Sequence, residues 1–133
     1  MTTAIKADKK LTPAELENAL AHFSGTEQYH KFSICSKLVL TDGAAFLAAN
    51  AGGGAFWLMD LIESYQSKCV KDKMLRDIQF WTLTVHEDRS ATIVCERDTN
   101  DVAFKQEIPS TDFPLKSVKL YVQNGVILLP GEY

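Results

Sequence analysis

The stretch IQFWTLTVHEDRSATIVCER, residues 78–97, alternates apolar and polar side chains on both sides of a polar turn. In its first half Trp81, Leu83 and Val85 fall on one side of the chain, and such alternation is typical of a half-buried strand. A connection of about four residues joins only antiparallel neighbours, because parallel strands need a long crossover. We therefore predict an antiparallel pair of strands over residues 78–86 and 91–97.

The same pattern continues toward the end of the chain. Residues 102–108, 117–122 and 126–129 are three further apolar runs, and Asn124-Gly125 separates the last two. Asn-Gly between apolar runs favours a tight hairpin, because both central residues must adopt a positive φ. The C-terminal half is thus predicted to be an antiparallel meander of about five strands.

The N-terminal half has helical spacing instead. Thr12, Pro13 and Glu15 form a capping-box pattern at the start of a first helix. Short extended pieces are expected at residues 29–34 and 37–40. We expect a second helix over residues 44–50 and a third over residues 55–68, whose apolar residues recur at helical intervals. About three N-terminal helices covering one face of an antiparallel sheet make an α+β domain.

Length and composition are those of one folded domain. The chain has 133 residues, of which 46% are hydrophobic and 23% are charged. We predict a single domain over residues 11–133 after a flexible tail of residues 1–10. No run of about 18 apolar residues and no apolar leader is visible, so we expect a cytoplasmic protein that does not contact a membrane. Cys35, Cys69 and Cys95 are too widely spaced for a disulfide framework or a zinc knuckle, and we expect free thiols.

The charges point away from sequence-independent nucleic-acid binding. The chain holds 14 Lys and Arg against 17 Asp and Glu, a formal net charge of −3. Residues 87–112 carry seven of these acids and three bases. This block is either a solvated strand surface or a binding surface for a basic protein. The candidate binding residues are Glu87, Asp88, Glu96, Asp98, Asp101 and Glu107.

Asp60 is the residue that most suggests catalysis. It lies inside an apolar run, and Glu63 follows three residues later, on the same side of a helix. Two carboxylates buried together would have a raised pKa suited to acid–base chemistry. The alternative is that Asp60 lies on the outer edge of the helix or bonds to a neighbouring polar group.

Three other patterns have weaker chemical meaning. The basic residues between Lys68 and Arg76 are either a nucleic-acid surface or a solvated segment. Residues 52–54, three glycines, precede a helix as a phosphate loop does, but no Lys-Ser/Thr follows, which favours a flexible break. The three histidines lack the spacing of metal ligands, so we expect no metal and no cofactor.

Several motifs together resemble a small bacterial family of domains of unknown function that also occurs on plasmids and phages. The similarity covers residues 11–133 and is strongest at the end of the chain, where the pattern is Leu-Leu-Pro-x-Glu-Tyr. The motifs are Thr41-Asp42-Gly43, residues 55–60 with Phe56-Trp57-Leu58-Met59-Asp60, Ser64-Tyr65-Gln66, Phe80-Trp81, residues 111–115, Leu120-Tyr121 and residues 124–133. The resemblance implies a self-contained domain without an assigned catalytic residue, and its mostly aromatic and aliphatic residues suit a shared core.

These observations favour a non-catalytic protein-binding domain with a basic protein partner. The mobile-element character of the resemblance suggests an inhibitor of a host defence system, such as an anti-CRISPR protein, whose acidic surface blocks a basic nucleic-acid channel. A small enzyme using Asp60 and Glu63 is the alternative, and a nucleic-acid binder through residues 68–76 is a third. The oligomeric state stays open.

Overall fold

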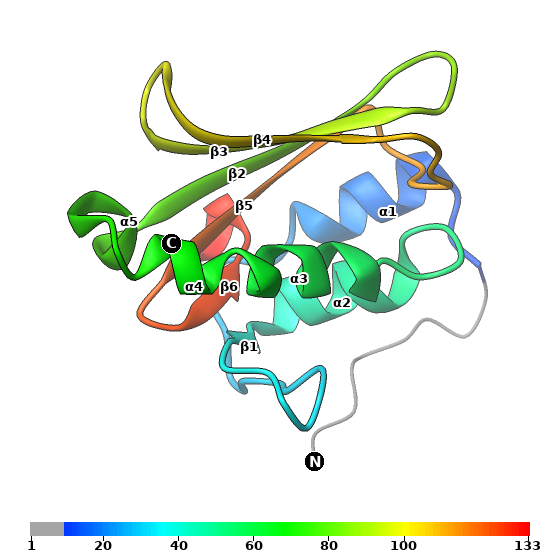
Figure 1. Cartoon of the computed structure of the whole chain (residues 1–133). Helices are drawn as coiled ribbons and strands as arrows, with labels where there is room; N and C mark the ends of the chain where they lie inside the picture. Colours follow the sequence, from blue (N-terminus) through cyan, green and yellow to red (C-terminus); the bar gives the residue numbers. More distant parts are fainter. Residues whose placement is uncertain (1–9) are drawn as a thin grey trace.

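The computed structural model describes residues 10–133, so the expected tail, residues 1–10, lies outside the described residues except for Lys10. One sheet of six strands runs through the molecule, in the order β1-β6-β5-β2-β3-β4. The helices gather on one side of it, as Figure 1 shows. The predicted α+β class is confirmed.

The elements follow the chain in this order: α1 (Pro13–Leu20), β1 (Val39–Leu40), α2 (Asp42–Asn50), α3 (Phe56–Ser64), α4 (Gln66–Cys69), α5 (Lys73–Asp77), β2 (Gln79–Val85), β3 (Ala91–Asp98), β4 (Asp101–Ile108), β5 (Ser117–Gln123), β6 (Val126–Leu128) and a terminal 3-10 turn, η1 (Pro130–Glu132). Within residues 10–133, no helix is both long and apolar enough to cross a bilayer.

The local signals for the ends of these elements are confirmed. Thr12 Oγ1 accepts a hydrogen bond from the Glu15 N–H at 3.1 Å, and the Glu15 carboxylate accepts one from the Thr12 N–H at 2.9 Å. At the other end of the chain Asn124 and Gly125 have φ values of 54° and 78°. This is the positive-φ pair that a tight hairpin turn between β5 and β6 requires.

The strand order corrects the expectation of a simple meander. Strands β2, β3 and β4 follow one another as predicted, but β5 pairs with β2 rather than with β4. This register places Leu120 of β5 beside Trp81 of β2, and both side chains are buried. Strand β4 has mostly exposed side chains and therefore fits the edge of the sheet. Residues 109–116 are long enough to lead the chain past β3 and β2.

Two expected elements also differ in extent. The third helix ends at Ser64, and a separate short helix, α4, begins after Tyr65. The Tyr65 ring packs against the rings of Trp81 and Phe104, with centroids 5.5 and 4.9 Å away. The extended piece expected at residues 29–34 is only an isolated bridge between His30 and Leu40.

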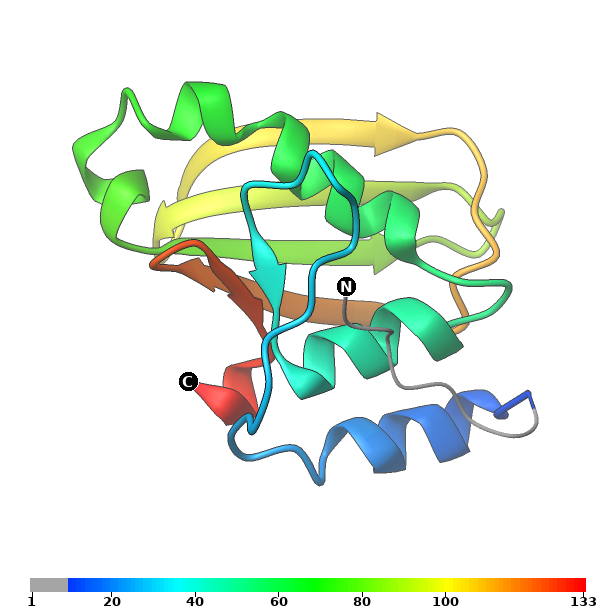
Figure 2. The ribbon, with the colours of Figure 1, turned by 90° about the horizontal axis from the view of Figure 1, so that it is seen from below.

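The sheet has one covered face and one open face. Figure 2 shows α2 and α3 lying across one side of the strands, with α1 beyond α2. Trp81, Leu83, Ile93 and Leu120 point to this side and are at most 2% exposed. The residues that alternate with them form what we call the open face, which no described helix covers: Phe80, Thr82, Thr84, Thr92, Val94, Glu96, Lys119 and Tyr121.

Candidate functional site

Hydrogen bonds join two of the sequence motifs, Thr41-Asp42-Gly43 and the C-terminal residues 124–133. One oxygen of the Glu132 carboxylate accepts hydrogen bonds from Thr41 Oγ1 at 2.6 Å and from the Leu129 N–H at 3.0 Å, and the other accepts one from the Gly43 N–H at 3.0 Å. A carboxylate at the start of α2 is favourable because the first N–H groups of a helix lack partners. A Cβ at Gly43 would lie 2.6 Å from Leu129 Cδ1 and 2.7 Å from Glu132 Oε1, so a larger residue would displace both side chains. These residues attach the end of the chain to α2.

The three glycines at residues 52–54 bind another part of the same chain. The Gly53 N–H donates to Asp112 Oδ2 at 2.8 Å. Gly52 has a φ of +59°, and a Cβ there would lie 2.7 Å from the Asp112 carbonyl oxygen. The Asp112 carboxylate thus already accepts the hydrogen bond from the N–H group that a phosphate would need. The expected break between two helices is confirmed, and this stretch joins it to the connection between β4 and β5.

A buried His–Asp pair lies between β1 and α2. The His30 ring is 1% exposed, and its Nε2 bonds Asp42 Oδ1 at 2.7 Å. This bond and one from the Glu27 N–H lower the pKa of the Asp42 carboxyl. The other ring nitrogen, Nδ1, has no hydrogen-bond partner among residues 10–133. The His30 ring therefore has no bonded thiol or hydroxyl among these residues that could act as a nucleophile.

The two buried cysteines, Cys69 and Cys95, are not activated as nucleophiles. Burial raises the pKa of Cys69 to about 11 and that of Cys95 to about 12, so both thiols stay protonated near neutral pH. All three are free, as expected, and Cys35 is exposed. Among the described residues no group of three or more His, Cys, Asp or Glu side chains could hold a metal ion.

Asp60 and Glu63 do not form a buried carboxylate pair. Asp60 is exposed on α3, the outer-edge position that was the alternative to a catalytic one. Glu63 Oε1 instead accepts hydrogen bonds from the backbone N–H groups of Lys37 at 2.8 Å and Leu38 at 3.0 Å. Glu63 thus anchors the segment before β1. The two side chains are therefore not buried together, and they contact different parts of the molecule.

The six acidic candidates do not lie on one surface, because four of them lie in or beside two turns at opposite ends of β3. Glu87 and Asp88 lie in the turn between β2 and β3, and Asp98 and Asp101 lie at the opposite end of β3. Asp101 pairs with Arg97 at 3.1 Å. The remaining two, Glu96 and Glu107, lie between these ends, and Thr92 Oγ1 donates to the Glu107 carboxylate at 2.9 Å.

Glu96 and Asp98 border a hollow of about 220 Å³ on the open face. Its other walls include Phe80 and Tyr121, whose rings meet edge to face with centroids 5.0 Å apart. Each carboxylate uses one oxygen to accept a backbone N–H of the β3–β4 turn. The second oxygen of each accepts no hydrogen bond from the described residues. Lys119 lines the opposite side.

Sequence reasoning placed Phe80 and Trp81 on opposite sides of a strand but did not find this hollow. Its two rings come from β2 and β5, which are about forty residues apart and adjacent only because of the strand order. Tyr133 extends the row, since its ring meets that of Tyr121 edge to face at 5.6 Å. The alternation in residues 78–86 was the only signal, and it identified one ring of the three.

The basic residues between Lys68 and Arg76 lie on α4, α5 and the turn between them. Lys68, Lys71, Lys73 and Arg76 are all exposed. Asp72 caps α5 and bonds Arg97 Nε at 2.7 Å, and the Arg97 guanidinium lowers the pKa of the Asp72 carboxyl. Asp72 therefore neutralises Arg97 rather than its neighbouring lysines. Of these four cations, Arg76 lines a cavity on the helix side of the sheet.

Comparison with known families gives a match, which covers most of the chain. The model of a family described as a family of unknown function (DUF6876) matches residues 14–133. The chain belongs to this family. No curated protein and no solved structure matches the chain. The DUF6876 match begins in α1 and ends at Tyr133, so it includes the contacts of Glu132 with α2 and of Asp112 with the glycines.

Proposed function

We propose that this DUF6876 protein is a non-catalytic binding domain that docks a basic protein segment on the open face of its sheet. The observation that carries the proposal is the hollow in which the rings of Phe80 and Tyr121 lie beside the carboxylates of Glu96 and Asp98. An arginine or lysine side chain fits this chemistry. Its charge pairs with the carboxylates, and its stem and head pack on the rings.

The partner contacts also extend beyond the hollow. Tyr133 is 69% exposed and continues the aromatic row, and Val102 in β4 is 50% exposed. Exposed aromatic residues with a charged rim are typical of protein interfaces. Lys119, on the opposite side of the hollow, would pair with an acidic group next to the inserted cation and so set the direction of the bound segment.

The finer version of the proposal is an inhibitor of a host-defence nuclease, carried on a mobile element. Such a nuclease binds nucleic acid in a basic channel, and a net charge of −3 does not oppose approach to that channel. In this version the open face covers the channel and excludes nucleic acid. This version requires binding but no catalytic residue, which agrees with the exposed position of Asp60 and with the protonated thiols of Cys69 and Cys95.

A charge-neutralising pair of variants tests the proposal. A short fluorescent arginine-rich peptide is titrated with wild type and with Glu96→Gln/Asp98→Asn, at low salt and at about 0.15 M salt. We expect about tenfold weaker binding of the double variant, because two exposed charge contacts and their cation–π support are worth about 1–2 kcal/mol together. Tyr121→Leu should weaken binding as well.

The matched control is Glu87→Gln/Glu17→Gln, which makes the same change in net charge at exposed sites away from the hollow. The control should bind the peptide as wild type does. Equal loss of affinity in both double variants would mean that net charge alone attracts the peptide and that the hollow is not its binding site. Capture from bacterial lysate with the same three proteins then identifies the partner, which wild type and control must retain and Glu96→Gln/Asp98→Asn must lose.

A further inference from the structure

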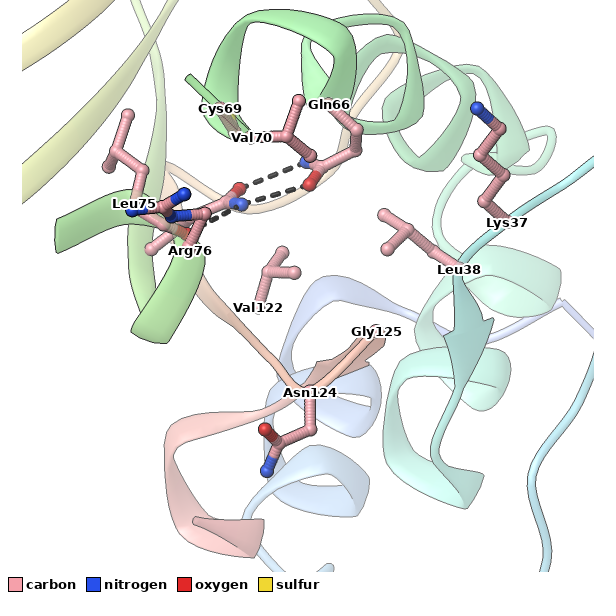
Figure 3. A pocket seen from close by; sticks show the side chains of 11 residues that line it. Lys37, Leu38, Gln66, Cys69, Val70, Leu75, Arg76, Val122, Asn124 and Gly125 are labelled. Carbon is pink, nitrogen blue, oxygen red and sulfur yellow. Dashed lines mark hydrogen bonds between the residues drawn. The ribbon is translucent and has the colours of Figure 1, made fainter. Parts of the chain in front are cut away.

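A second cavity, of about 240 Å³, lies on the helix side of the sheet. It opens between α4 and α5 on one side and the segment before β1 and the β5–β6 turn on the other. Figure 3 shows Leu38, Val70 and Val122 reaching into it from three different segments. Cys69 and Leu75, both 1% exposed, complete the apolar wall.

One wall is polar, but its hydrogen bonds are already complete. The side-chain amides of Gln66 and Gln79 donate to each other at 2.9 Å in both directions, as the dashed lines in Figure 3 mark. Gln79 also accepts from Trp81 Nε1 at 2.9 Å and donates to the Leu75 carbonyl, and Gln66 donates to the Ile62 carbonyl. This pair is a rigid wall that has no remaining donor to offer a ligand.

Two cations remain available at the mouth. Lys37 and Arg76 lie on opposite sides of the cavity in Figure 3, and neither side chain has an ion pair among the described residues. Within residues 10–133, no carboxylate lines the cavity. Of the acids near these cations, Glu63 accepts the Lys37 and Leu38 N–H groups and Asp72 pairs with Arg97, while the exposed Asp77, next to Arg76 in the sequence, does not line the cavity.

We propose that this cavity binds a small organic anion: a carboxylate with a compact apolar body. The body fills the space between Leu38, Val70 and Val122, and the carboxylate lies at the mouth between Lys37 and Arg76. Pockets for drug-sized ligands measure roughly 300–1,000 Å³, so this cavity suits a smaller, metabolite-sized molecule. The proposal does not depend on the binding of a basic protein, because the two sites share no residue.

The chemistry separates this ligand from the alternatives. A bare phosphate would gain from the two cations but would leave the apolar walls in contact with water. A neutral aromatic molecule would fill the walls and leave the cations unused. An anion with an apolar body uses both, and a guanidinium can hold a carboxylate with two parallel hydrogen bonds.

The test is a titration followed by NMR of the methyl groups, with phenylacetate as probe. We expect saturable shifts of the Leu38, Val70 and Val122 methyl signals. Phenylacetamide, the same body without charge, and inorganic phosphate, the charge without the body, should each bind at least tenfold more weakly. Equal affinity for phenylacetamide or for phosphate would overturn the proposal, and so would the absence of saturable shifts with phenylacetate.

Variants locate the anion. Lys37→Gln/Arg76→Gln should weaken phenylacetate binding at least tenfold and leave phenylacetamide binding unchanged. The control Lys116→Gln/Lys105→Gln removes the same charge from exposed positions outside the cavity. Val70→Asp places a negative charge on an exposed residue at the mouth and should also weaken the binding of phenylacetate. All three keep buried residues intact, and unchanged melting curves confirm their folding. Equal effects of the two double variants would refute the assigned contacts.

Discussion

At the scale of single residues, what a carboxylate bonds to separates a structural role from a binding role. Glu63, Asp112 and Glu132 each accept backbone N–H groups from distant parts of the chain. Glu96 and Asp98 bond only within their own turn, and each keeps one oxygen that accepts no hydrogen bond from the described residues. Residues of the first kind hold the fold together, and residues of the second kind remain available to a partner.

Glu132 offers the clearest test of a structural carboxylate. Replacing it in Glu132→Ala leaves the Gly43 N–H and the Thr41 hydroxyl without their acceptor at the start of α2. We expect a loss of about 1–3 kcal/mol in the free energy of unfolding, because partly buried donors lose their partners. Thermal melting followed by circular dichroism measures it, as a lower Tm of roughly 3–5 °C per kcal/mol.

The control for this change is Glu17→Ala, an exposed glutamate on α1. It should stay within about 0.5 kcal/mol of wild type, as surface substitutions usually do. A Glu132→Ala protein that melts together with Glu17→Ala would show that the end of the chain does not support α2.

At the scale of elements, the connections decide the arrangement. The α2–α3 connection and the β4–β5 connection touch where Gly53 bonds Asp112. This contact fixes one end of the long path that leads the chain from the sheet edge back to β2. Short turns place strands next to each other, whereas this longer connection needs a specific contact to hold it.

Gly52→Ala should break that contact. The position has a φ of +59°, and an added Cβ would lie 2.7 Å from the Asp112 carbonyl oxygen. Strain in the backbone and the close approach both oppose the substitution, and we expect a loss of about 1–3 kcal/mol, measured by urea denaturation. Gly25→Ala is the matched control, because an added Cβ there meets nothing within 4 Å. A neutral Gly52→Ala would mean that this connection can move without cost.

At the scale of the whole molecule, the sheet separates the two proposed sites. The hollow lies on the open face, and the cavity lies on the helix side, between α4, α5 and the segment before β1. The strands β2 and β5 supply residues to both because their side chains alternate between the faces. The two cations of the cavity, Lys37 and Arg76, and the two acids of the hollow, Glu96 and Asp98, therefore lie on opposite sides of the sheet.

This separation predicts that the two ligands bind independently. Saturation with phenylacetate should leave the affinity for the arginine-rich peptide within about twofold at about 0.15 M salt, where the screening length is about 8 Å. Peptide titrations with and without phenylacetate measure the coupling. A change of tenfold or more would show that β2 or β5 shifts when the cavity is filled.

The sequence was sufficient for features that depend on near neighbours. Thr12 and Glu15 identified the start of α1, Asn124-Gly125 identified the last hairpin, and the alternation in residues 78–97 identified β2 and β3. Capping bonds and tight turns join residues only a few positions apart, so a short window of the amino-acid sequence contains all the residues that form them. The α+β class follows from the change of period between the two halves.

Only the tertiary structure decided which segments meet. It placed β5 beside β2, which brought Tyr121 to Phe80, and it sent the acidic residues of one sequence block to both ends of β3. It also placed Lys37 across a cavity from Arg76 and put Asp60 on the surface. The physical reason is that strand order minimises the exposed apolar area of the whole chain, a sum over distant contacts that no local window of sequence contains.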